Sequence, residues 1–192
     1  MIARRTTEPA AEPVTLAEAK LHLRVDHSDE DTYITGLITA ARLMCEQRTG
    51  KTLISSGWTA YADAFEDEMV LPNPSGTAVA SITYVDVNGT TQTLDSSAYR
   101  VDMVSDPARI KPVTEWPETD DRMNAVVVVY TAGYANAGAV PMPLKQWCLL
   151  AIGDMYENRT ASDRPIGTAN ASASVPHAFV DNLLAAYRVA AL

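Results

Sequence analysis

Residues 79–94 read VASITYVDVNGTTQTL, and this stretch decides the fold class. It is rich in Val, Thr, Ile and Tyr, which are favoured in strands. Asn88-Gly89 in its middle is the strongest short signal for a β-hairpin. We therefore predict strands at 79–87 and 90–94. Because helical patterns lie on both sides of this region, the hairpin indicates a β module inserted into a helical chain.

The strand-rich region extends on both sides of the hairpin, over residues 53–140. Residues 126–129 are a continuous run of valine, which predicts a strand covered on both faces. The same preference for Val, Thr, Ile and Tyr predicts further strands at 57–64, 69–71, 99–104 and 125–130.

A short helix is predicted before this module. Thr15-Leu16-Ala17-Glu18 is a capping box, in which the Thr15 hydroxyl accepts from the Glu18 amide and the Glu18 carboxylate reaches back. The apolar positions that follow lie on one helical face as far as Leu23.

Two longer helices complete the helical pattern. Ser28-Asp29-Glu30-Asp31 places an N-cap and acidic residues at the start of the second helix, which Gly50 ends. Pro143 begins the third helix, with Trp147 in its apolar stripe, and residues 156–159 end it. Because each helix has a single apolar stripe to bury, we expect the helices to pack together.

These elements predict an α+β fold in which N- and C-terminal helices form a base and an antiparallel β module is inserted between them. We expect a flexible arm at 1–13, because the segment before Val14 shows no apolar period. The expected helical domain combines 14–52 with 141–192, and the β module covers 53–140.

The composition argues against several classes of protein. Lys and Arg total 15 against 24 Asp and Glu, so the net charge of -9 disfavours a surface that follows nucleic acid by neutralising phosphates. A surface of acidic side chains that repels DNA without binding it is compatible with this net charge. No apolar run approaches the roughly 20 residues of a membrane span, and we expect the chain to be cytosolic when made. Cys45 and Cys148 lie within predicted helices, as buried free thiols do.

The sequence shows no motif typical of catalysis. It lacks a Walker-type phosphate-binding loop (Gly-x-x-x-x-Gly-Lys-Ser/Thr), His-Glu-x-x-His, Cys-x-x-Cys and Gly-x-Ser-x-Gly. His22 and His27 resemble a metal pair only loosely, and His177 has no neighbouring ligand. Helix capping explains the acidic run at 29–31 more simply than a cation site does. We expect no catalytic residue, no metal and no cofactor.

Two segments are candidates for contacts with other molecules. At the end of the third helix, Tyr156 and Arg159 either complete the helix or, with Glu157, pair with a neighbouring subunit. We expect a mobile loop over 160–174. An apolar C-terminal segment follows, and it either docks on a partner or folds back on its own helices; the candidates in it are Phe179, Leu183, Leu184, Tyr187 and Arg188.

Several of these segments, in this order, resemble the head-to-tail connector proteins of tailed phages and prophages. The resemblance covers about 14–189 and rests on residues 15–20, 23–26, 29–31, 130–134, 140–143, 156–159 and 183–189. Members of this family are often labelled as possible DNA-packaging proteins.

The resemblance implies a structural virion protein rather than an enzyme. A connector forms a ring of its own copies, docks beneath the portal after DNA packaging, extends the DNA channel and presents a surface to a stopper or tail protein. DNA would pass without sequence-specific binding, at the head-to-tail junction of a virion assembled in the host cytoplasm, with no membrane involved. The alternatives are a DNA-packaging accessory and a ligand-binding β module, which would use Trp58, Tyr61, Tyr84 and Trp116.

Overall fold

The protein, as a computed structural model, contains two compact units. The residues described are 1–73, 78–159 and 177–189. The β unit contains Met1–Ala11, the described part of Gly50–Asn136, and Val189. The helical unit contains Glu12–Thr49 and the described part of Ala137–Arg188. The α+β class, with a helical base and an inserted antiparallel module, is confirmed.

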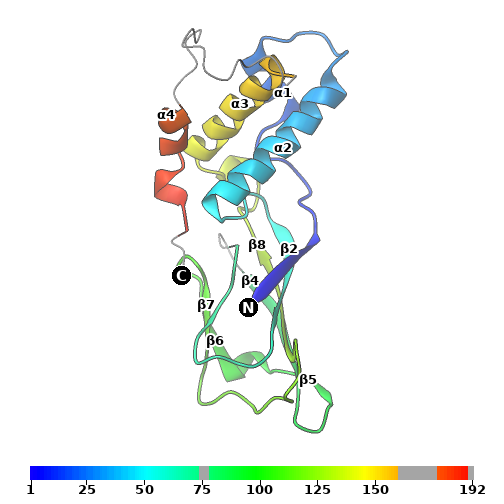
Figure 1. Ribbon diagram of the computed structural model, residues 1–192, viewed down its shortest axis with the longest axis vertical. Coiled ribbons are helices and arrows are strands. Elements are labelled where there is room, and N and C mark those ends of the chain that lie inside the picture. Colours follow the sequence, from blue (N-terminus) through cyan, green and yellow to red (C-terminus); the bar gives the residue numbers. More distant parts are fainter. Residues whose placement is uncertain (74–77, 160–176, 190–192) are drawn as a thin grey trace, which may run out of the picture. The chain divides into compact units, whose positions relative to one another are not determined.

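Helices from both ends of the chain form the helical unit (Figure 1). They are α1 (Leu16–Leu23), α2 (Asp31–Thr49), α3 (Met142–Glu157) and α4 (His177–Asn182), followed by the 3-10 turn η4 (Ala185–Tyr187). Helix α2 packs against α3, and the Cys148 thiol lies 4.0 Å from the Ala41 carbonyl oxygen. Most residues of the predicted apolar stripes are buried, although Met44 on α2 is exposed and Ala151 and Met155 on α3 are half-buried. The buried residues of these faces are Ile34, Leu37, Ile38, Ala41 and Cys45 on α2, and Leu144, Trp147, Cys148 and Ile152 on α3.

The capping box that the sequence predicts begins α1. The Thr15 hydroxyl accepts from the Glu18 amide at 3.2 Å, and the Glu18 carboxylate accepts from the Thr15 amide at 2.7 Å. These bonds satisfy amides that have no partner inside the helix. The same carboxylate accepts from the Lys145 ammonium at 2.8 Å, which joins α1 to α3.

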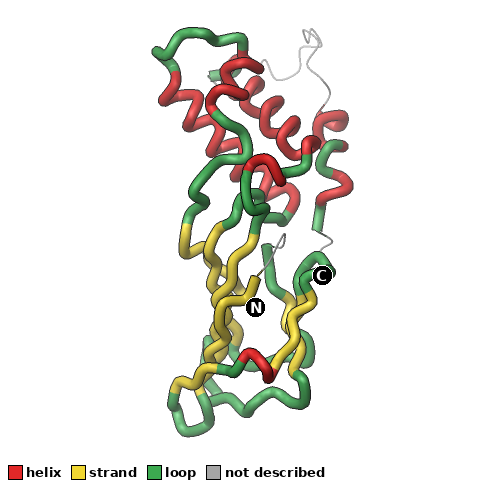
Figure 2. The backbone as a smooth tube through the Cα atoms, turned by 180° about the vertical axis from the view of Figure 1, so that it is seen from behind, coloured by secondary structure: helices red, strands yellow, loops and turns green. Residues whose placement is uncertain are grey.

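Two antiparallel sheets form the β unit. The strands of the first, in the order β1-β2-β8-β4-β5, are Ile2–Thr7, Ser56–Ala62, Val126–Ala132, Ala78–Val85 and Thr91–Thr93. The second sheet is β3-β7-β6, of Met69–Val70, Arg109–Pro112 and Tyr99–Asp102. Figure 2 shows the backbone of both sheets. The predicted hairpin joins β4 to β5, and Gly89 in its turn has a φ of 77°.

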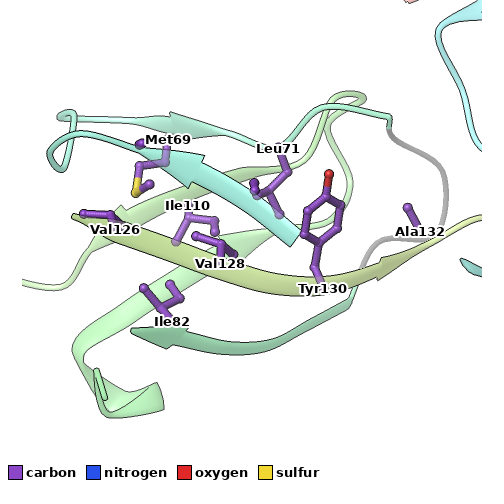
Figure 3. Packing of buried hydrophobic residues seen from close by; sticks show 10 residues of the cluster. Met69, Leu71, Ile82, Ile110, Val126, Val128, Tyr130 and Ala132 are labelled. Atoms are coloured by element: carbon purple, nitrogen blue, oxygen red, sulfur yellow. The ribbon is translucent and has the colours of Figure 1, made fainter. Parts of the chain in front are cut away.

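The core of the β unit lies between these sheets. Met69, Leu71 and Ile110 from one side point toward Val128 and Tyr130 on β8 (Figure 3). All five side chains are almost fully buried, and the Tyr130 hydroxyl donates to the Pro72 carbonyl at 2.8 Å. This hydrogen bond satisfies the polar end of the largest of these side chains.

The central strand β8 alternates between two faces. Val126 and Val128 are buried, whereas Val127 is half-buried and Val129 is 38% exposed. The prediction that this strand is covered on both faces is therefore wrong. An antiparallel sheet needs only one packed face, so a run of valine can place alternate side chains on the open face.

The prediction of a flexible arm at 1–13 is wrong for residues 2–7. They form β1, which pairs with β2 from Ile2 opposite Tyr61 to Thr7 opposite Gly57. The inward Arg5 is covered by its contact with Trp58, whose ring centroid lies 4.8 Å from the guanidinium. A cation therefore occupies a position where the sequence pattern would require an apolar residue. Strand β7, Arg109–Pro112, was also missed by the pattern, because it has a single buried apolar residue, Ile110.

Candidate functional site

The end of α3 is bound to the start of α2 and the residue before it by four side chains, which we call the Arg159 cluster: Glu30, Tyr33, Tyr156 and Arg159. The Arg159 guanidinium donates to the Glu30 carboxylate at 2.5 Å, and the Tyr156 hydroxyl donates to the other oxygen of that carboxylate. The guanidinium also lies 4.7 Å from the ring centroid of Tyr33 and 4.8 Å from that of Tyr156. Two of the predicted interface residues thus bind within the subunit.

The electrostatics of the Arg159 cluster favour the charged form of its carboxylate. The hydrogen bond from Tyr156, followed by that from Arg159, lowers the pKa of Glu30. The same bond raises the pKa of Tyr156. Because a bonded carboxylate is easier to ionise and its donor harder to deprotonate, Glu30 is ionised and Tyr156 neutral at pH 7.

Glu157 differs from its two neighbours. Its side chain is exposed, and it forms no hydrogen bond or ion pair with any residue that the structure describes. A charged group without an internal partner remains available to another molecule. Among the candidates at the end of α3, Tyr156 and Arg159 would have to break their hydrogen bonds to Glu30 to bind another molecule. Glu157 could bind one without breaking a contact given by the described residues.

The C-terminal segment folds back on its own helices. Leu184 is fully buried, and the Asp181 carboxylate binds the Arg48 guanidinium at 2.6 Å and the Trp147 indole nitrogen at 3.4 Å. Of the two interpretations of this segment, the structure shows the fold-back form. Leu184 is therefore a core residue of the helical unit in this conformation, and it is unavailable to a partner.

The other candidates in this segment are distributed differently. Leu183 and Tyr187 are half-buried, and Arg188 is exposed. The backbone of Phe179 lies in α4, but its side chain and the loop predicted to be mobile at 160–174 fall outside the described residues. Arg188 forms no hydrogen bond or ion pair within the described part of the chain. It is the second charged candidate that can reach a partner directly.

Sequence reasoning missed Glu30, Tyr33 and Asp181 as parts of these clusters. Glu30 was assigned to the acidic start of α2, where capping alone accounts for its presence. No spacing rule relates it to Arg159, which lies 129 residues later. The available signal is the cation at the end of α3, because Arg159 has no acidic residue three or four positions before it in the helix.

The aromatic residues of the β module do not line one groove. Trp58, Tyr84 and Trp116 are partly buried against the core between the sheets. Tyr61 stands opposite Val127, in the outward register of β2 and β8. Their rings therefore face different sides of the sheet, and the arrangement gives no support to a ligand-binding β module.

The described residues also hold no group of three or more His, Cys, Asp or Glu side chains that could bind a metal ion. Among the helices in the described ranges, none has the length and hydropathy to cross a membrane.

Comparison with known proteins was made at the level of families and of solved structures. Residues 13–105 match the family described as phage gp6-like head-tail connector protein. The whole chain also resembles 97% of a chain in the neck of an empty gene transfer agent (GTA) particle computed with C6 symmetry, at 25% identity and a TM-score of 0.77. The family match and the full-length likeness together support a head-tail connector.

Two other solved structures show the same likeness to this connector. A chain in the virion of the native gene transfer agent particle has 25% identity and a TM-score of 0.79, and one in the native neck computed with C12 symmetry has 24% and 0.77. Each comparison covers 100% of the connector and 97% of the other chain. A search of curated proteins gives no match.

Proposed function

We propose that this connector is the ring-forming adaptor of a phage-like particle, placed between the portal and the tail. The observation that carries the proposal is its full-length likeness to a neck chain of particles computed with C6 and C12 symmetry. In this role it docks beneath the portal after packaging, extends the DNA channel and presents a surface to a stopper or tail protein. The connector would be a structural component of the virion and catalyse no reaction.

The charge of the chain supports a channel that DNA passes through without being held. Each copy has a net charge of -9, so a ring concentrates negative charge around the DNA path. A protein that binds DNA tightly must neutralise phosphates with clustered cations. The excess of 24 acidic over 15 basic residues argues against such binding and favours a wall from which DNA slides.

The geometry also divides the candidate interface into two kinds of residue. The Arg159 cluster and Leu184 fix the shape of the helical unit, because their partners lie within it. Glu157 and Arg188 are exposed and have no partner among the residues described, so we assign them to contacts with the portal or a neighbouring copy. The half-buried Leu183 and Tyr187 would border this contact.

The decisive experiment is size-exclusion chromatography with light scattering, on the connector alone and mixed with its cognate portal. A complex with the mass of the portal plus a ring of connectors is expected. Glu157→Lys should weaken the complex, whereas Asp26→Lys, an equal charge change at another exposed residue of the helical unit, should not. Absence of any complex with the wild-type chain would overturn the proposed function.

A further inference from the structure

The outward face of the three-stranded sheet contains a hollow of about 310 Å3 with an unusual set of charges. We call it the basic hollow. Three cations and two carboxylates line it: Arg100, Arg109, Lys111, Glu68 and Asp102. Arg100 and Asp102 lie on β6, opposite Lys111 and Arg109 respectively on β7.

Both carboxylates of the basic hollow already have partners. Glu68 binds Arg109 at 2.9 Å through one oxygen and Lys111 at 2.6 Å through the other. Asp102 accepts from the amide of Val104 at 2.9 Å and from the hydroxyl of Ser105 at 2.5 Å, within its own loop. No carboxylate in the hollow remains for a further cation.

Arg100 is the cation that remains. It is exposed, and its guanidinium forms no hydrogen bond, ion pair or ring contact with any described residue. Lys111 stands directly opposite it on the neighbouring strand. Two like charges opposed across an antiparallel pair repel each other. A carboxylate placed between them would reduce this repulsion and accept two parallel N–H hydrogen bonds from the guanidinium.

The same β unit contains a surface of opposite charge in two loops, 63–67 and 113–124, which we call the acidic loops. The Trp116 ring is stacked on Phe65 with centroids 4.6 Å apart, and its nitrogen donates to the Glu66 carbonyl at 2.7 Å. The Asn124 amide donates to Asp63 at 2.7 Å. The loops therefore hold each other in place and carry carboxylates that form no ion pair within the described ranges: Glu66, Asp67, Glu115, Glu118, Asp120 and Asp121.

We propose that the basic hollow of one copy binds a carboxylate of the acidic loops of the neighbouring copy around the ring. This inference rests on the proposed function. A cyclic assembly of more than two copies uses head-to-tail contacts, so each copy must carry two different, complementary patches. The basic hollow and the acidic loops are two such patches within one unit.

A carboxylate of another copy fits the basic hollow better than DNA does. The three cations and two carboxylates of the hollow give it a net charge of +1. Glu68 binds both Arg109 and Lys111, and Asp102 binds groups of its own loop, so the charge of Arg100 remains. One free guanidinium suits one carboxylate, which it can bind through two parallel hydrogen bonds. A phosphate backbone would bring repeated negative charge past Glu68 and Asp102, where it would be repelled.

The test is a charge reversal in the full-length chain, with ring formation on the cognate portal measured by light scattering and electron microscopy. Arg100→Glu should reduce the yield of rings by at least about tenfold at a fixed concentration. Arg24→Glu makes the same change at an exposed residue of the helical unit and should leave the yield unchanged. The thermal midpoint of Arg100→Glu should not fall, because the variant removes a repulsion from Lys111.

A second variant tests the partner surface. Glu118→Arg with Asp121→Arg should prevent ring formation alone and restore it when combined with Arg100→Glu, since the charges are then exchanged. Rings of Arg100→Glu at wild-type yield would overturn the inference and leave the proposed function intact. If Arg100→Glu forms rings at normal yield and the particles only lose retention of DNA, the basic hollow binds DNA. The inference is then overturned as well. Failure of the wild-type chain to form rings would overturn the proposed function itself.

Discussion

The Arg159 guanidinium binds the Glu30 carboxylate at 2.5 Å across 129 residues of sequence. The contact fixes the residues just after α3 to the loop before α2, and the rings of Tyr33 and Tyr156 lie against the same guanidinium. Each of these elements contributes to the helical unit. The conformation in which the chain leaves α3 is therefore set by a local cluster, before any partner binds.

We expect Arg159→Ala to lower the thermal midpoint of the connector at pH 7, since Glu30 loses its cation. The pKa of Glu30 is lowered in the folded state, so its contribution to stability is present above its unfolded pKa and is lost as the pH falls through the folded value. The difference in thermal midpoint between the wild type and Arg159→Ala, measured by calorimetry, should become smaller toward acid pH. Adding Glu30→Gln to the variant should cause little further loss, because the pair acts as one unit. Full additivity would show that the two residues are independent.

Glu18→Gln should destabilise the chain by about 1 to 2 kcal/mol at pH 7, because it weakens both the capping box and an ion pair that is partly exposed to solvent. Hydrogen bonds from Lys145 and then from the Thr15 amide hold the pKa of Glu18 at about 2. The contribution is complete above the usual pKa of 4.5 and disappears as the pH falls toward 2. Urea unfolding at pH 7 and at pH 2.5 measures both. Glu157→Gln, the same change at an exposed residue, should have no such effect.

The elements that the sequence predicted are those specified by local signals. Thr15 and Glu18 lie three residues apart, so their capping box is visible before the fold is known. Asn88-Gly89 similarly places the β4–β5 hairpin. Strand β1 has no local signal, because its inward Arg5 is covered by Trp58, a residue 53 positions later on β2. The pairing with β2 specifies this strand. The alternation of polar and apolar residues within β1 does not indicate a strand.

The position of the candidate interface stays a prediction. The motif at the end of α3 lies in a cluster of charged and aromatic side chains of the subunit itself. Spacing left open whether Arg159 binds inside or outside the subunit, because only the fold brings Glu30 to it. Leu184 shows the same limit of spacing. An apolar residue after a polar loop is compatible with docking or with folding back, and only the fold shows that its side chain is buried in the helical unit.

Trp147→Ala should reduce the free energy of unfolding by about 3 to 5 kcal/mol. The Trp147 side chain is 3% exposed, and it contacts the Arg48 guanidinium at 5.4 Å from its ring centroid. Removing it leaves a cavity between α2 and α3 and also deprives Arg48 of its ring. Trp147→Phe retains most of the volume and should cost clearly less. Unfolding in urea, followed by circular dichroism, measures both, and equal stability of Trp147→Ala and wild type would place the ring outside the core.

Truncation after Arg159, which retains the Arg159 cluster, should destabilise the helical unit as well as remove the C-terminal segment. Leu184 is fully buried and Asp181 binds both Arg48 and Trp147, so the truncated chain loses a core side chain and exposes the surface beneath it. Leu184→Ala should alone cost about 2 to 5 kcal/mol, and Leu183→Ala, at a half-buried neighbour, should cost less. Thermal unfolding of the three proteins, together with binding to the cognate portal, separates two roles of the segment. If the truncated connector melts like the full chain but no longer binds the portal, the segment is a docking element that contributes nothing to the fold. If Leu184→Ala melts early yet binds the portal normally once folded, the segment belongs to the core, which is the result that the burial of Leu184 leads us to expect.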